Sequence, residues 1–122
     1  MEKAIITCAL TEGATTRTRA DNQPTSPEEI AKEAEAAVKA GAAVVRLNVR
    51  DEAGKPTSDI KQLRRTIRLL QERLTCLVEL SCVIAPDASL EDRRKVLSLK
   101  PDIVAIPCGS ANLGGNVLIQ SG

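Results

Sequence analysis

The chain has 122 residues, 27% of them charged, and a formal net charge of +1. This length fits one domain, residues 1–122, and the balanced charge argues against a nucleic acid or a membrane surface as a partner recruited by bulk electrostatics. No segment reaches the roughly 20 consecutive apolar residues that span a bilayer, and no signal peptide pattern is present, so we expect a cytoplasmic location. The sequence contains no His, Phe, Tyr or Trp, so imidazole, the commonest metal ligand and general base, is missing.

The first two predicted elements are a strand and a helix. Residues 3–11 alternate between two faces, which predicts a strand. A helix is predicted to begin at Ser26, because Ser26 can cap it, Pro27 suits the first helical position and Glu29 completes a capping box. Gly41 can take the left-handed conformation that ends a helix.

A second strand and a second helix follow. Residues 43–49 form the predicted strand, and the helix is predicted to begin near Ser58. Its apolar residues form one stripe: Ile60, Leu63, Ile67, Leu70 and Leu74. Arg64, Arg65 and Arg68 lie off this stripe, which favours a solvated helix face over an anion site.

The same alternation continues to the end of the chain. We predict a third strand at residues 76–81, a short helix at about residues 89–97 and a fourth strand at residues 103–106, followed by a Gly-rich segment at residues 108–116. The connections are too long for hairpins and suit parallel crossovers. We therefore expect an α/β fold with about four parallel strands and three helices.

Several segments carry a resemblance to a known family: IITCAL, GATTR, SPEEIAKEAEAAVKAGAAVV, RLNVRDEAGKPTSD, LSLKPDIVAI and CGSANLGG. In this order, over essentially the whole chain, they resemble the β-keto acid cleavage enzymes, which include 3-keto-5-aminohexanoate cleavage enzyme. The resemblance implies the N-terminal half of a TIM barrel, a parallel (β/α) half-barrel, because family members are about twice this length. It also implies zinc-dependent chemistry, in which the metal polarises a β-keto acid and acetyl-CoA takes part in carbon-carbon cleavage, giving acetoacetate and a new CoA ester.

The resemblance places Arg46 and Asn48 where the family has two zinc-binding histidines. Arginine cannot ligate a metal, and asparagine is a poor zinc ligand beside imidazole or thiolate. A further ligand, an acid/base Asp and a substrate-binding Arg belong to the C-terminal half of the family barrel. We therefore expect no bound metal or cofactor and no zinc chemistry from this chain by itself.

Other positions of the family pattern are either retained or changed in this chain. The family's Ser-Thr-Gly-Gly after the third strand is Ser81 followed by Cys-Val-Ile, which would narrow or reshape a ligand pocket. Asp51 also stands where the family has it. The resemblance implies substrate-binding positions at Arg50, Ser81, Ser110 and Asn112, although retained residues at strand ends can serve loop structure alone.

Strand alternation gives an independent view of this region. It sends Arg46 and Asn48 toward the barrel axis, where Glu79 and Ser81 also point from the next strand. Because an unpaired buried charge is costly, we hypothesise that an ion pair between Arg46 and Glu79 occupies the place of the zinc site. The alternative is that both side chains bend toward solvent at an open edge.

Two further features have competing interpretations. Cys82 and Cys108 could form a thiol site at the carboxyl ends of their strands, but we favour small residues at the core edge, because no His or basic neighbour is placed to lower either pKa. The segment GSANLGG lacks the ending of a P-loop. The resemblance implies that it lines the substrate pocket, where it could bind a carboxylate.

Four parallel strands would leave two unpaired sheet edges and an apolar surface. We therefore expect a homo-oligomer, or a pair with a complementary C-terminal half-barrel chain. For function we favour a degenerate, non-zinc homologue with a small β-keto acid pocket or none. The open alternatives are a subunit that completes an active enzyme with a second chain, a non-catalytic interaction domain, and a truncated reading frame without selected function; the residues do not decide whether the chain is an enzyme.

Overall fold

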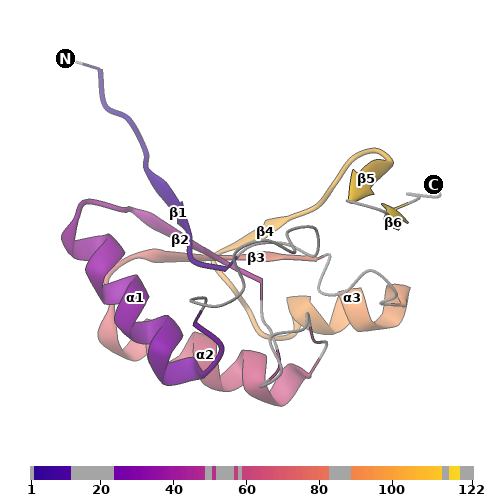
Figure 1. Cartoon of the computed structure of the whole chain (residues 1–122), viewed down its shortest axis with the longest axis horizontal. Coiled ribbons are helices and arrows are strands. Elements are labelled where there is room, and N and C mark those ends of the chain that lie inside the picture. Colours follow the sequence, from indigo (N-terminus) through magenta and orange to yellow (C-terminus); the bar gives the residue numbers. More distant parts are fainter. Residues whose placement is uncertain are drawn as a thin grey trace.

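The computed structural model describes residues 2–11, 24–48, 51, 57, 59–82, 89–113 and 116–118. A four-stranded parallel sheet has the order β1-β2-β3-β4. Its strands are β1 (Thr7–Ala9), β2 (Val44–Leu47), β3 (Leu77–Ser81) and β4 (Ile103–Ala105). The helices α1 (Pro27–Lys39), α2 (Ile60–Arg73) and α3 (Leu90–Leu97) alternate with them and lie on one side of the sheet (Figure 1). The predicted α/β fold, a partial barrel of four parallel strands with three helices, is confirmed.

The signals that begin and end α1 act as predicted. The Ser26 side chain accepts a hydrogen bond from the Glu29 amide at 3.2 Å, and the Glu29 carboxylate accepts one from the Ser26 amide at 3.1 Å. This capping box satisfies backbone groups that have no partner inside the helix. Gly41 follows the helix with a φ of 110°, so it ends the helix as predicted.

The second helix begins slightly later than the sequence predicts. Its N-cap is Asp59, whose carboxylate accepts a hydrogen bond from the Lys61 amide at 2.8 Å; Ser58, the residue near which the sequence predicts the start, lies outside the described residues. Aspartate caps a helix as well as serine does, so composition alone does not separate the two positions. Arg64, Arg65 and Arg68 are exposed, as predicted.

The core lies between the helices and one face of the sheet. Val45 and Leu47 of β2 and Val78 and Leu80 of β3 are at most 1% exposed and face the helices, as the alternation predicts. The helices supply the remaining buried residues of the cluster: Ile30, Ala31, Ala34, Leu63, Ile67, Leu70 and Val96. Because the core needs only one face of the sheet, the other face is available for polar residues.

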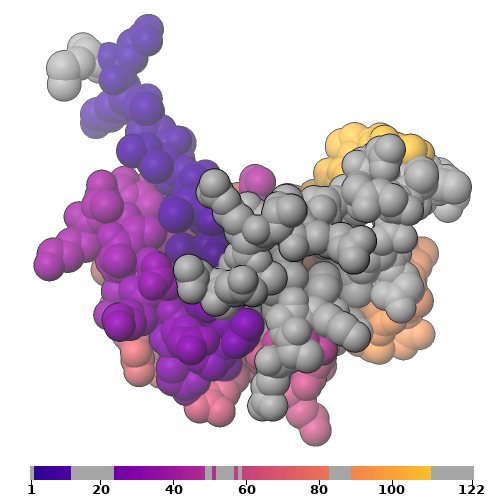
Figure 2. Space-filling model, in the orientation of Figure 1, coloured from indigo at the N-terminus to yellow at the C-terminus, as the bar shows by residue number. Residues whose placement is uncertain are grey.

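The structure corrects one predicted strand and adds a pair of strands near the end of the chain. The first strand covers Thr7–Ala9 and not residues 3–11, because β2 begins only at Val44 and offers no strand for earlier residues to pair with. Residues 2–6 are exposed and project from the body of the molecule (Figure 2). Part of the Gly-rich segment, for which the sequence pattern predicts no strand, forms an antiparallel pair, β5 (Ala111–Leu113) and β6 (Asn116–Leu118).

Some surface features of the sheet matter for association. Strands β1 and β4 stand at its two ends. On the face turned away from the helices, Leu77 is 48% exposed and Ile103 is 36% exposed. None of the helices in the described ranges has the length and apolar composition needed to cross a membrane.

Candidate functional site

The candidate site lies on the face of the sheet that is turned away from the helices. The parallel register aligns Ala9, Arg46, Glu79 and Ile103 in one row across the four strands. Side chains in such a row point to the same face of a sheet. Two of the four are charged, so this row defines the chemistry of the site.

Arg46 and Glu79 form an ion pair across β2 and β3. The Arg46 Nε donates to Glu79 Oε1 at 2.8 Å, and Arg46 Nη2 lies 2.7 Å from the same oxygen. The Glu79 residue is only 5% exposed, whereas the Arg46 side chain is 45% exposed. The pair hypothesised from strand alternation is therefore present, and it compensates a carboxylate that would otherwise be buried alone.

Asn48 lies two residues after Arg46 and joins β1 to β2. The buried Thr11 hydroxyl donates to the Asn48 carbonyl at 2.5 Å and accepts from the Asn48 amide at 2.6 Å. The Asn48 carboxamide nitrogen also donates to the Thr11 carbonyl at 3.2 Å. A hydroxyl can donate and accept at once, so Thr11 fixes the backbone and the side chain of Asn48 together.

The four expected substrate-binding residues are distributed as follows. Ser81 is half-buried two residues after Glu79, on the same face of β3. Ser110 is exposed in the segment that follows β4. Asn112 is part of β5, where only the backbone is described, and Arg50 lies outside the described residues. Among the described side chains of these four residues, that of Ser81 shares a sheet face with the Arg46–Glu79 pair, and the binding role of all four stays a prediction.

The two cysteines near the carboxyl ends of β3 and β4 differ in environment. Both are free thiols, Cys82 buried and Cys108 exposed. Burial raises the pKa of the Cys82 thiol, and the positive charge of Arg93 opposes that shift. The premise that no basic residue is placed to lower either pKa is therefore wrong for Cys82, although burial still dominates. A raised pKa disfavours the reactive thiolate.

The site is thus built from a guanidinium, a carboxylate, a carboxamide and a hydroxyl. Within the described ranges, no group of three or more His, Cys, Asp or Glu side chains could hold a metal ion together. The ion pair uses Nε and Nη2 of Arg46, which leaves Nη1 for another acceptor. Because the Arg46 side chain is half exposed, a small carboxylate can reach it from solvent.

Comparison with known proteins places the chain in a family. The family model of the beta-keto acid cleavage enzymes matches residues 3–121. The chain belongs to this family. The resemblance expected from the sequence segments is therefore confirmed.

Individual members of the family are similar to the chain. The 3-keto-5-aminohexanoate cleavage enzymes of Fusobacterium nucleatum and Acetoanaerobium sticklandii are 35% and 33% identical, each over 95% of this chain. The 3,5-dioxohexanoate:acetyl-CoA acetone transferase of Paraburkholderia graminis is 30% identical over 92% of the chain. The chain spans 43% of the length of the first two proteins and 37% of the third.

Thr11 and Arg93 belong to this region but are not among the predicted site residues. Thr11 follows β1 with the same parity as Thr7 and Ala9, so the alternation already places it on the face of Asn48. That signal could have identified Thr11. The charge of Arg93 in α3 acts on the Cys82 thiol, and no periodicity within one element reveals that a helix residue is near a strand end.

Proposed function

We propose that this chain is a non-zinc homologue of the β-keto acid cleavage enzymes, in which the Arg46–Glu79 pair occupies the place of the metal. The observation that carries the proposal is the ion pair itself, with its buried carboxylate and its contact of 2.7 Å. A homologue of this kind does not catalyse zinc-dependent cleavage by itself. It keeps, at most, a pocket for the carboxylate of a small β-keto acid.

The residues at this place do not fit a zinc ion. Zinc in proteins takes nitrogen, sulfur or carboxylate ligands, almost always four in structural sites and three with a water in catalytic sites. The guanidinium of Arg46 offers donors only, and the Glu79 oxygen nearest to it accepts from Arg46. The Asn48 carboxamide is held by the Thr11 carbonyl. A metal would have to displace the cation that stabilises Glu79.

What the pair can still do is bind an anion. The Arg46 side chain is 45% exposed and its Nη1 takes no part in the ion pair with Glu79, and a guanidinium binds carboxylates through charge-assisted hydrogen bonds. Ser81, on the same face two residues beyond Glu79, is the neighbouring polar group. We therefore expect weak binding of a small carboxylic acid without turnover.

An activity assay tests this proposal. The chain is incubated with zinc, acetyl-CoA and 3-keto-5-aminohexanoate, the compound for which two of the relatives are named, and acetoacetate is measured. We expect no acetoacetate above the protein-free control. Zinc-dependent formation by the unmodified chain alone would refute the proposal.

A gain-of-function variant makes the test sharper. Arg46→His combined with Asn48→His places two imidazoles at alternate positions in β2 and just after its end, so we expect zinc affinity to rise at least about tenfold, because imidazole is a standard zinc ligand. The matched control is Arg65→His combined with Arg94→His, which places two imidazoles on separate exposed helices. Equal zinc binding by the two variants would show that zinc affinity does not depend on placing the imidazoles at positions 46 and 48.

A second candidate function rests on the length of the relatives. Because the chain spans 43% of the Fusobacterium nucleatum enzyme, a separate chain could supply the missing catalytic groups to a composite barrel. Strands β1 and β4, at the ends of the sheet, are the edges that such a partner would pair with. Mixing the chain with the C-terminal half of that relative distinguishes the two candidates: cleavage that requires both components supports the composite enzyme, and its absence supports the non-zinc homologue.

A further inference from the structure

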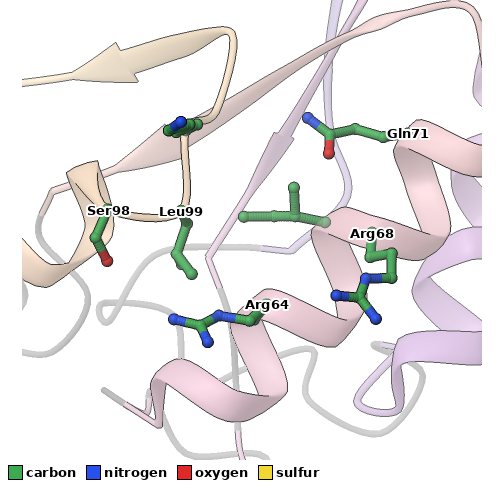
Figure 3. A pocket seen from close by; sticks show the side chains of 7 residues that line it. Arg64, Arg68, Gln71, Ser98 and Leu99 are labelled. Atoms are coloured by element: carbon green, nitrogen blue, oxygen red, sulfur yellow. The ribbon is translucent and has the colours of Figure 1, made fainter.

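A cavity of about 230 Å³ lies on the helix side of the sheet, away from the Arg46–Glu79 pair. In Figure 3 the Arg64 side chain of α2 extends toward Ser98 and Leu99, which belong to the connection after α3, and Arg68 and Gln71 lie farther along α2. Lys100, the next residue of that connection, also lines the cavity. This connection leads into β4, so the cavity is near the amino end of that strand.

The cations of this cavity differ from the other arginines of α2 in their partners. Arg65 forms an ion pair with Glu28 of α1, and Arg73 lies 3.7 Å from a carboxylate oxygen of Glu35. Within the part of the chain that the structure describes, no carboxylate pairs with Arg64, Arg68 or Lys100, and no acidic residue lines the cavity. The helix therefore carries arginines of two kinds, those paired with α1 and those gathered at the cavity.

Lys100 is held in an unusual backbone conformation at this place. Its φ is 51°, a left-handed value that is strained for a residue other than glycine. Pro101 follows it, and the residue before a proline favours extended backbone. The Lys100 amide donates to the Leu97 carbonyl at 3.2 Å, so the strained residue is part of the turn that ends α3 and leads to β4.

From the cavity and its charges, we propose that this is a binding site for a phosphate group. Two guanidiniums and an ammonium from two separate elements match a dianion, and guanidiniums bind phosphate in bidentate fashion. The Gln71 carboxamide adds a neutral donor. The volume of 230 Å³ is below the roughly 300–1,000 Å³ of typical organic ligand pockets, so the site accommodates a phosphate or diphosphate group and not a complete large ligand.

Neither the helix dipole nor simple solvation accounts for the whole arrangement of cations. A cation after the end of α3 interacts favourably with the dipole of that helix, which explains a lysine there. It does not explain two arginines on the neighbouring helix. A solvated face, which the sequence pattern favours, does not require those arginines to line the same cavity as Lys100.

Nuclear magnetic resonance of the ¹⁵N-labelled chain tests the proposal, with inorganic phosphate and diphosphate as probes at constant ionic strength. We expect saturable shifts of the Arg64 and Arg68 Nε signals and of the Lys100 amide, whereas chloride produces none. If diphosphate saturates at lower concentration than phosphate, the site takes a phosphorylated compound; the reverse order identifies free phosphate as the ligand. Shifts that do not saturate, or that chloride reproduces, overturn the proposal.

Substitutions locate the binding. Arg64→Gln combined with Arg68→Gln is expected to weaken phosphate binding about tenfold or more, because charge-assisted hydrogen bonds are lost. The matched control Arg65→Gln removes a neighbouring charge of the same helix that points to Glu28, and should change the affinity less than about twofold. Equal losses in both variants would indicate nonspecific attraction and contradict the site.

A third variant separates binding from folding. Lys100→Gly removes the cation and relieves the left-handed strain, so the melting temperature should rise by about a few degrees while the phosphate affinity falls. An unchanged affinity in a stabilised Lys100→Gly chain would exclude Lys100 from the site.

Discussion

The residue with the greatest consequence for this sheet is Glu79, a carboxylate that is 5% exposed at the centre of a parallel sheet. Among the residues that the structure describes, Arg46 is the side chain that forms an ion pair with it. Removing one partner of such a pair leaves an uncompensated buried charge, whereas replacing both is far less costly. The two substitutions are therefore expected to be strongly non-additive.

Arg46→Gln should lower the free energy of unfolding by about 1–3 kcal/mol, less than for a fully buried pair because Arg46 is half exposed. Adding Glu79→Gln should recover part of that loss. Urea unfolding followed by far-UV circular dichroism measures both. Arg65→Gln, whose partner Glu28 is exposed, is the control and should cost at most about 0.5 kcal/mol. Equal effects of Arg46→Gln and Arg65→Gln would show that the buried carboxylate does not depend on Arg46.

The two thiols near the strand ends give a second test at this scale. Burial raises the pKa of Cys82, and Cys108 is exposed. At pH 8 iodoacetamide should therefore label Cys108 faster than Cys82, because the thiolate is the nucleophile. Peptide mass spectrometry after timed quenching resolves the two rates. Faster labelling of Cys82 would mean that the Arg93 charge outweighs burial.

At the scale of elements, the sequence predicts what depends on local periodicity and capping. The Ser26 capping box and the face of β2 that carries Val45 and Leu47 follow from spacing alone. The end of β1 does not, because strand length depends on where β2 offers a partner. The predicted elements do not include the β5–β6 pair, although in the sequence Gly114 and Gly115 stand between its two strands, a spacing typical of hairpins.

In the candidate site, too, the sequence predicts what alternation within a strand decides and does not predict contacts between elements. Alternation predicts that Arg46 and Glu79 share a face, and the ion pair is present. The effect of the Arg93 charge on Cys82 depends on how helices pack beside strands. So does the position of Lys100 in the same cavity as two arginines of α2. No pattern within a single element contains that information.

The capping box of α1 makes a prediction about stability and pH. Ser26→Ala should lower the free energy of unfolding by about 1 kcal/mol at pH 7.

Backbone hydrogen bonds from Ser26 and Thr25 hold the pKa of Glu29 below its ordinary value of 4.5. A lowered pKa in the folded state contributes stability above the unfolded value and loses it as the pH falls. The advantage of the unmodified chain over Glu29→Ala should therefore shrink below pH 4.5, as urea unfolding at several pH values can measure; a constant difference would contradict this.

At the scale of the whole molecule, the sheet has the exposed apolar residues of an association surface. Leu77 is 48% exposed on the face opposite the helices, and β1 and β4 stand at the ends of the sheet. Open edges and exposed apolar side chains favour pairing with another chain. We propose that the 122-residue chain self-associates through this face when no other partner covers it.

Sedimentation velocity with interference detection tests this, because the chain has no Tyr or Trp for absorbance at 280 nm. We expect an oligomer at micromolar concentration. Leu77→Asp should shift the chain toward monomer, whereas Leu90→Asp, at a residue of α3 that is 65% exposed, should not. A stable monomer of the unmodified chain, or equal effects of both variants, would count against the proposed surface.

Direct measurement of zinc tests the central claim, that an arginine–glutamate pair holds the place of the metal. The purified chain is equilibrated with zinc, dialysed, and its metal content determined by mass spectrometry relative to protein. The ion pair predicts only substoichiometric zinc, unchanged by Asn48→Ala. Stoichiometric zinc that resists dialysis and is lost on Asn48→Ala would contradict the account.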